Sequence, residues 1–177
     1  MKSWRPSRPS ERPAGGLPTR VVGVDPGLVG TGYAVLESGP AGIDVLDAGV
    51  IETRATMALA ERVHAIYDGL SGLLDKHGPT AVVVEDLYTS YAFPRTALLM
   101  AHARGVICLA AHQKDLPVLT LAPAEVKRAI AAHGAASKEQ IQHSIQRLLS
   151  LAELPRPSHV ADALALAFTG LGRLRLR

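Results

Sequence analysis

The sequence contains one cysteine, few aromatic residues and no long hydrophobic run. Cys108 is the single cysteine among 177 residues, which excludes an internal disulfide and a cysteine-based zinc site. No apolar run reaches the roughly 18 residues that a membrane span needs, and the N-terminus lacks the apolar core of a secretory signal. We therefore expect a cytosolic protein with no membrane span. Hydrophobic residues still make up 47% of the chain, enough for a substantial core, and its length favours one domain.

Positive charge is concentrated at the two ends of the chain. Residues 1–20 carry a net charge of +4 and the last five residues +3, which leaves −4 for residues 21–172. Basic ends suit an anionic partner such as nucleic acid, and a solubilising extension is the alternative. We predict a disordered Pro- and Gly-rich tail over residues 1–19, one domain over 20–172 and a basic tail over 173–177. If the partner is nucleic acid, some acids of the domain must bind cations.

Hydrophobic patterning predicts an α/β fold. Strand-like runs cover residues 20–24, 31–37, 43–51, 80–86 and 116–122. Helical patterns cover a segment ending at Gly78, then 95–113, a helix from Pro123 to near Gly134, a helix capped by Ser137 and Gln140, and a last helix over 159–171 capped by Ser158. This order predicts a five-stranded mixed sheet flanked by helices, in which the first three strands form the antiparallel part.

Two acids follow apolar runs that are predicted to be buried strands. Asp25 ends the first strand and Glu85 ends the fourth. If these strands are adjacent and parallel, both carboxylates emerge at the edge where α/β folds bind ligands. Each acid alone would more often end a strand or cap a turn. The glycines that follow Asp25 allow a close approach of backbone or substrate, and they fit ordinary hairpin turns as well.

His159 and Asp162 lie three residues apart and therefore share one face of the last helix. Alone, such a pair indicates little, because an acid in a first helical turn is also favoured by the helix dipole. Together with Asp25 and Glu85 it offers three carboxylates and an imidazole that could converge. Clustered carboxylates suit Mg²⁺ or Mn²⁺, and two such ions can promote hydrolysis of a phosphodiester. An acidic domain could thus act on a polyanion.

Three segments, in this order and spacing, resemble the RuvC family of bacterial Holliday-junction resolvases: GVDPGLVGTGYAVLE, VVVEDLY and HVADALALA. The resemblance extends from about residue 21 to 172. It implies a ribonuclease H-like fold, a homodimer, and symmetric nicking of two like strands of a four-way DNA junction that depends on Mg²⁺ (or Mn²⁺), with two ions per site. It also implies cooperation with the RuvA and RuvB branch-migration proteins.

The resemblance assigns roles to individual residues. Asp25, Glu85 and Asp162 match catalytic, metal-binding acids, and His159 stands where many members have a fourth acid. We expect His159 to be a metal ligand; handling a proton or contacting the scissile phosphate are its alternative roles. The segment EVKRAIAAHGAASKEQI resembles the part of the family that carries two functional lysines, which fall on Lys127 and Lys138. Tyr88 matches an aromatic residue placed at the junction centre.

Two further expectations concern a loop and a helix. Tyr91 and Phe93 lie in the same loop as Tyr88 and either stack on bases or pack under the loop. The helix over 95–113 is apolar on nearly all sides, so it is covered either in a homodimer or within a monomer, and the family resemblance favours the homodimer. Other functions remain open: a RuvC-like nuclease acting on other branched DNA or on RNA, and a non-catalytic junction-binding protein. An actin- or Hsp70-like ATPase would need a second glycine-rich loop and a longer chain.

Overall fold

Five strands and five helices make up the part of the chain that the structure, a computed structural model, describes: residues 19–39, 42–86, 94–131 and 136–175. The strands are β1 (Thr19–Asp25), β2 (Gly30–Gly39), β3 (Gly42–Glu52), β4 (Ala81–Glu85) and β5 (Val118–Leu121). The helices are α1 (Leu59–His77), α2 (Pro94–His112), α3 (Pro123–Ala131), α4 (Lys138–Leu148) and α5 (Ser158–Arg175). None of these helices combines the length and hydrophobicity that crossing a bilayer requires.

The strands form one mixed sheet in the order β3-β2-β1-β4-β5. The first three strands are an antiparallel meander, whereas β4 is parallel to β1 and β5 is parallel to β4. The predicted α/β architecture with a five-stranded mixed sheet is therefore confirmed. Val24 of β1 pairs with Val84 of β4, so the next residues, Asp25 and Glu85, end adjacent parallel strands at one edge.

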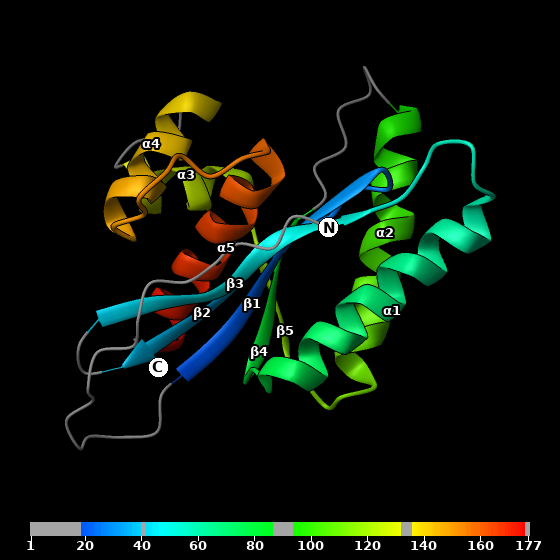
Figure 1. Cartoon of the computed structure of the whole chain (residues 1–177), viewed down its shortest axis with the longest axis horizontal. Coiled ribbons are helices and arrows are strands. Elements are labelled where there is room, and N and C mark those ends of the chain that lie inside the picture. The colour runs from blue at the N-terminus through cyan, green and yellow to red at the C-terminus, as the bar shows by residue number, and fades with distance from the viewer. Residues whose placement is uncertain (1–18, 40–41, 87–93, 132–135, 176–177) are drawn as a thin grey trace.

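Helices cover both faces of the sheet (Figure 1), with α3, α4 and α5 on one face and α1 and α2 on the other. Val21 and Val83 pack in the core beneath α5, and Val22 and Val82 pack in the core beneath α1 and α2. Because β4 is buried on both faces, its apolar run is continuous. A Cβ on Gly23 would lie 2.3 Å from a backbone oxygen of α5, so this helix rests directly on the sheet backbone.

Helix ends follow signals in the sequence. Ser137 and Gln140 form the predicted capping box of α4: the Gln140 backbone N–H donates to Ser137 Oγ (3.2 Å), and the Ser137 N–H donates to Gln140 Oε1 (2.8 Å). The C-cap of α1 is Gly78, whose φ of 53° lies in the left-handed region. Glycine adopts this conformation without the steric cost that a Cβ imposes.

Regular structure extends into both segments that we expected to be tails. β1 begins at Thr19, which pairs with β2 in the sheet. At the other end, α5 continues to Arg175, where Arg173 Nε lies 2.9 Å from Glu125 Oε1 of α3 and forms an ion pair. The helix and this tertiary contact thus lie beyond the end that we predicted at residue 171. The rest of both tails lies outside the described residues.

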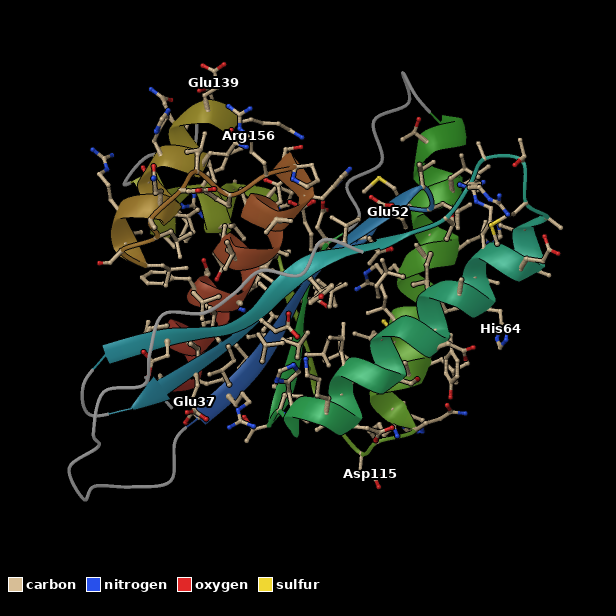
Figure 2. All side chains as sticks on the ribbon, in the orientation of Figure 1. Glu37, Glu52, His64, Asp115, Glu139 and Arg156 are labelled. Carbon is tan, nitrogen blue, oxygen red and sulfur yellow. The ribbon has the colours of Figure 1, made fainter. Side chains whose placement is uncertain are left out.

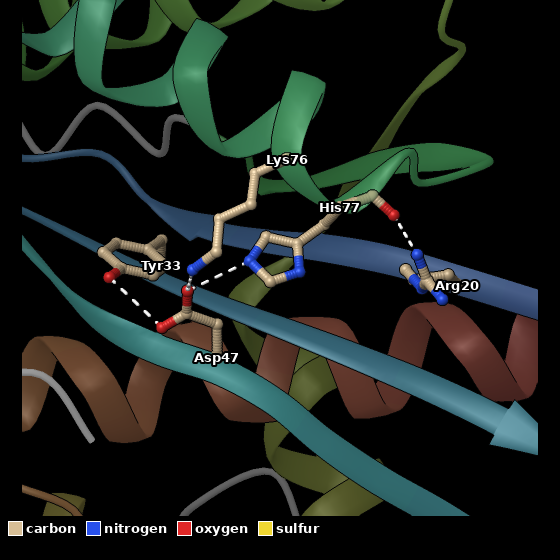
Figure 3. A network of polar contacts seen from close by, with 5 residues as sticks. All are labelled: Arg20, Tyr33, Asp47, Lys76 and His77. Carbon is tan, nitrogen blue, oxygen red and sulfur yellow. Dashed lines mark hydrogen bonds and ion pairs between the residues drawn. The ribbon is translucent and has the colours of Figure 1, made fainter. Parts of the chain in front are cut away.

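A polar network links the C-terminal end of α1 to the outer strands (Figure 3). Asp47 of β3 accepts a hydrogen bond from Lys76 (2.8 Å), lies 3.0 Å from Nε2 of His77, and accepts from the hydroxyl of Tyr33 (3.5 Å). Burial raises the pKa of Asp47, but the hydrogen bonds from Lys76 and His77 outweigh it and leave that pKa below its usual value. Burial, together with Asp47, raises the pKa of Tyr33 to about 12. The network holds α1 on the sheet.

Candidate active site

Two carboxylates end adjacent central strands and line one cavity of about 570 Å³. Asp25, at the end of β1, is only 8% exposed, and Glu85, at the end of β4, is half-buried. Gly30 lines this cavity and pairs with Glu52 in the sheet. The label of Glu52 in Figure 2 therefore marks the end of the sheet at which the cavity lies, and the label of Asp115 marks the opposite end. The parallel strands therefore bring the two predicted acids to one edge.

The first turn of α5 brings the other two predicted residues to the same cavity. His159 and Asp162 both line it. His159 Nδ1 lies 2.7 Å from Asp25 Oδ2 although the two residues are 134 positions apart. The structure thus gathers three carboxylates and an imidazole, from three separate elements, around one cavity.

Gly32 of β2 makes this arrangement possible. A Cβ at Gly32 would lie 2.1 Å from the backbone oxygen of His159 and 2.6 Å from its carbonyl carbon. Such distances do not occur between real atoms, so only glycine lets the first turn of α5 rest here. The sequence left open whether the glycines after Asp25 serve a hairpin or a close approach. For Gly32 the close approach is observed.

The clustered acids raise one another's pKa values. Burial, followed by the charges of Asp25 and Asp162, raises the pKa of Glu85 to about 7, while Lys138 and Lys127 oppose this shift. Burial and then Asp25 raise the pKa of Asp162. The hydrogen bond to Asp25 raises the pKa of His159, partly offset by burial. The lysines offset the charge of these carboxylates only in part, so the cluster favours bound protons or cations.

This cluster predicts an unusual pH dependence of stability when divalent ions are removed. The pKa of Glu85 rises from 4.5 to about 7 on folding, so the folded state binds more protons between these values. The free energy of unfolding should then fall as pH rises through this window, by about 2 kcal/mol after allowance for solvent screening. Glu85→Gln should remove this fall in the free energy of unfolding. The variant should therefore be more stable than the parent at pH 8 and about as stable as the parent at pH 4.

Urea denaturation with a chelator present, at pH 4, 6 and 8, measures this difference. The exposed Glu153 provides a matched control, because Glu153→Gln should follow the parent at every pH. Equal stabilities of Glu85→Gln and the parent at pH 8 would contradict the electrostatic description of the cluster.

Two lysines lie on the α3–α4 side of the cavity. Lys127 of α3 and Lys138 of α4 both line it, and Lys138 Nζ lies 3.8 Å from Asp162 Oδ2. The Lys138 side chain is 77% exposed, so it remains available to an anion. The third residue expected to contact substrate, Tyr88, lies outside the described residues, as do Tyr91 and Phe93.

Arg62 of α1 also lines the cavity, although we did not select it from the sequence. Arg62 stands in an amphipathic helix, where a charged residue is usually solvent-exposed. The structure nevertheless leaves it only 8% exposed. Its spacing is the signal that could have found it: Arg62 lies four residues before Ile66, on the stripe of α1 that is buried, whereas its neighbours Glu61 and His64 are exposed. In the fold, its Nε donates a hydrogen bond to Thr53 Oγ1, in the segment that follows β3.

The donor set fits divalent cations with a preference for oxygen. Three carboxylates supply hard oxygen ligands, and the imidazole of His159 adds a nitrogen that is more favourable for Mn²⁺ than for Mg²⁺. Among the described residues, no group of three His, Cys, Asp or Glu side chains is already arranged to hold an ion. One oxygen of Asp25 is instead engaged by His159. The residues thus have the right chemistry without forming a complete ligand shell by themselves.

Comparison with known proteins identifies the family. Residues 21–170 match the family model described as crossover junction endodeoxyribonuclease RuvC. This chain belongs to the RuvC family. Its relatives include the crossover junction endodeoxyribonuclease RuvC of Rhodopirellula baltica, 42% identical over 150 residues that cover 85% of this chain and 84% of the relative. The RuvC of Dictyoglomus turgidum is 39% identical over an alignment that covers 84% of this chain and 94% of that relative.

Solved structures agree with this assignment and identify the fold as ribonuclease H-like. Thermus thermophilus RuvC superposes with a TM-score of 0.81 at 35% identity, covering 89% of this chain and 96% of its own. The T. thermophilus RuvC in complex with a Holliday junction substrate gives the same TM-score at 34% identity, with the same coverage. The yeast mitochondrial Holliday junction resolvase Ydc2 shares the fold, with a TM-score of 0.58 at 15% identity. The predicted membership of the RuvC family is confirmed.

Proposed function

We propose that this chain is a Holliday-junction resolvase that nicks two like strands of a four-way DNA junction symmetrically. The observation that carries the proposal is the convergence of Asp25, Glu85, His159 and Asp162 on one cavity, in a member of a family whose relatives are named crossover junction endodeoxyribonucleases. A RuvC relative has been solved with a Holliday junction substrate.

The proposed cofactor is Mg²⁺ or Mn²⁺, two ions per site, held by Asp25, Glu85, His159 and Asp162. Bound divalent ions would activate the attacking water and stabilise the leaving oxygen of the phosphodiester. Mg²⁺ commonly combines one or two carboxylates with phosphate oxygens of the substrate. An incomplete protein shell is consistent with that pattern, in which DNA supplies the missing ligands.

The chain's own residues prepare the site for a polyanion. Lys127 and Lys138 bring positive charge to the cavity, which would offset the negative charge of a DNA phosphate. In the ion-free state Glu85, with a pKa near 7, holds a proton below neutral pH, so cation binding should release it. His159 keeps Asp25 oriented through the 2.7 Å contact. Together these groups bind and position the substrate before chemistry.

We also propose a homodimer formed through α2. Leu98 and Leu109 lie eleven residues apart on this helix and are 65% and 48% exposed. Eleven residues are close to three helical turns, so both fall on one face, with the exposed Ala101, His102 and Gly105 between them. An apolar, small-residue face of this kind suits helix packing against a second copy. A two-fold axis would match the two equivalent strands of a junction.

Three further parts of the proposal rest on family membership alone. Tyr88 would act at the junction centre. RuvA and RuvB would be partners in branch migration, and the activity would take place in the cytoplasm, where bacterial DNA is located.

Cleavage of a synthetic four-way junction tests the proposal against its alternatives. We expect paired, symmetric nicks in the junction when Mg²⁺ or Mn²⁺ is present. Plain duplex should not be nicked, and a chelator should abolish nicking of the junction. Preferential cleavage of flaps, forks or RNA would instead favour a RuvC-like nuclease of other specificity. Junction binding without cleavage under any metal condition would favour a non-catalytic binding protein.

The role of His159 can be tested by replacement with a hard oxygen ligand. Because imidazole favours Mn²⁺ over Mg²⁺, His159→Asp should raise the ratio of Mg²⁺-supported to Mn²⁺-supported nicking by about tenfold. The exposed His143, remote from the cavity lining, gives a matched control in His143→Asp. An unchanged ratio in His159→Asp would count against metal ligation and favour a role in proton transfer or phosphate contact.

A further inference from the structure

Arg62 is a buried cation in the wall of the active-site cavity. It is 8% exposed and lines the same cavity as Asp25 and Glu85. Burying a guanidinium is costly unless an anion or a set of hydrogen bonds compensates its charge. No carboxylate forms an ion pair with it among the residues that the structure describes. The cavity therefore contains a positive charge that the described protein does not neutralise.

The position of Arg62 is fixed by one of its five donors. Its Nε donates to Thr53 Oγ1 at 3.1 Å. Thr53 in turn donates from its hydroxyl to the carbonyl of Leu28, and from its backbone N–H to the carbonyl of Val29 at 2.9 Å. This chain of bonds anchors the guanidinium to the turn that follows Asp25. Within the described part of the chain, the two terminal nitrogens have no hydrogen-bond partner, so their four N–H groups remain for another acceptor.

Arg62 approaches the cavity from the opposite face of the sheet to the two lysines. It belongs to α1, whereas Lys127 and Lys138 belong to α3 and α4, which cover the other face (Figure 1). The positive charges that chiefly lower the pKa of Glu85 are those of Lys138 and Lys127. Between described residues, Arg62 forms no ion pair with these carboxylates, whereas Lys138 pairs with Asp162. The position of Arg62 suits a second phosphate, next to the phosphate that would lie at the carboxylates and the two lysines.

We propose that Arg62 binds a DNA phosphate adjacent to the scissile one, through its terminal guanidinium nitrogens. This inference rests on the proposed function, since it assumes that a DNA strand enters the cavity. A planar guanidinium held at Nε presents its remaining N–H groups in the geometry that phosphate oxygens accept in pairs. Arg62 and the lysines would then hold one strand on both sides of the carboxylates and keep the scissile phosphate in place.

The salt dependence of junction binding provides the test, because each neutralised phosphate of B-DNA contributes about 0.9 to the slope of log K against log salt. Fluorescence anisotropy of a labelled four-way junction, with a chelator present to prevent cleavage, measures that slope. Arg62→Gln should bind about tenfold more weakly and reduce the slope by about 0.9 for each site engaged. Arg62→Lys should retain the slope while binding more weakly than the parent.

Two controls separate phosphate binding from a structural role. Thr53→Val removes the bond to Nε and keeps the charge, so it should lower stability and leave the slope unchanged. Lys114→Gln, at the opposite end of the sheet beside Asp115 (Figure 2), should match the parent in slope. An unchanged slope in Arg62→Gln, or an equal loss of slope in Thr53→Val, would overturn the proposal.

Ethylation interference on the unmodified protein covers the case in which Arg62→Gln fails to fold. Ethylating a phosphate adjacent to the scissile one should weaken binding, and the absence of any effect at either neighbour would overturn the inference. A parent protein that does not nick junctions would contradict the proposed function itself. Nicking by the parent with no effect of Arg62→Gln on the slope would reject only the role of Arg62.

Discussion

Asp25→Asn should abolish nicking of a four-way junction, lowering the rate on the order of a thousandfold or more, and leave junction binding largely intact. The substitution keeps the shape of the side chain but removes the negative charge at a position that is 8% exposed and lies 2.7 Å from His159. Cation affinity should fall with that charge. Glu85→Gln should have the same effect, since it removes the neighbouring carboxylate of the cluster.

Single-turnover cleavage and anisotropy binding, measured in parallel on the same preparations, distinguish lost chemistry from lost binding. Asp44→Asn is a matched control, because Asp44 is an exposed acid of β3 that does not line the cavity. It should cleave as fast as the parent. Retained nicking in Asp25→Asn or Glu85→Gln would overturn the assignment of catalysis to these side chains.

Gly32→Ala should disable the site without changing any catalytic side chain. The added Cβ would lie 2.1 Å from the backbone oxygen of His159, and a backbone atom cannot move aside as a flexible side chain can. The first turn of α5 would have to shift away from β2 and displace His159 and Asp162 from Asp25. We expect a loss of about 1–3 kcal/mol in the free energy of unfolding and about a hundredfold loss of nicking.

Gly39→Ala tests whether this effect is specific to the contact. Gly39 is also in β2, and an added Cβ there meets no atom within 4 Å. Urea denaturation and nicking assays on both variants should show loss only for Gly32→Ala. Parent-like nicking by Gly32→Ala would mean that the position of α5 on the sheet is not what assembles the site.

The elements and the acidic part of the site could be predicted because their signals are local. The continuous apolar run of β4 indicated burial on both faces, and the capping box at Ser137 located the start of α4. Asp25 and Glu85 were recognisable because a charge directly after a buried strand needs an explanation. The shared helix face of His159 and Asp162 indicated little alone but made them candidates beside these two acids, and the family resemblance then assigned their roles.

The remaining features depend on contacts between distant segments. The spacing of Arg62 from Ile66 places it on the buried face of α1, but its hydrogen bond to Thr53 is a tertiary contact that α1 alone does not specify. α5 extends to Arg175, and Arg173 in its last turn pairs with Glu125 on another helix. Neither contact follows from hydrophobic periodicity, which reports only which face of an element is apolar.

The most direct measurement of the central claim is anomalous diffraction from crystals of the protein grown with Mn²⁺ and a four-way junction that resists hydrolysis. The account predicts manganese in the cavity, with Asp25, Glu85 and Asp162 among its ligands and a DNA phosphate beside it. A bound junction with no manganese at these carboxylates, or with manganese only elsewhere on the protein, would contradict it.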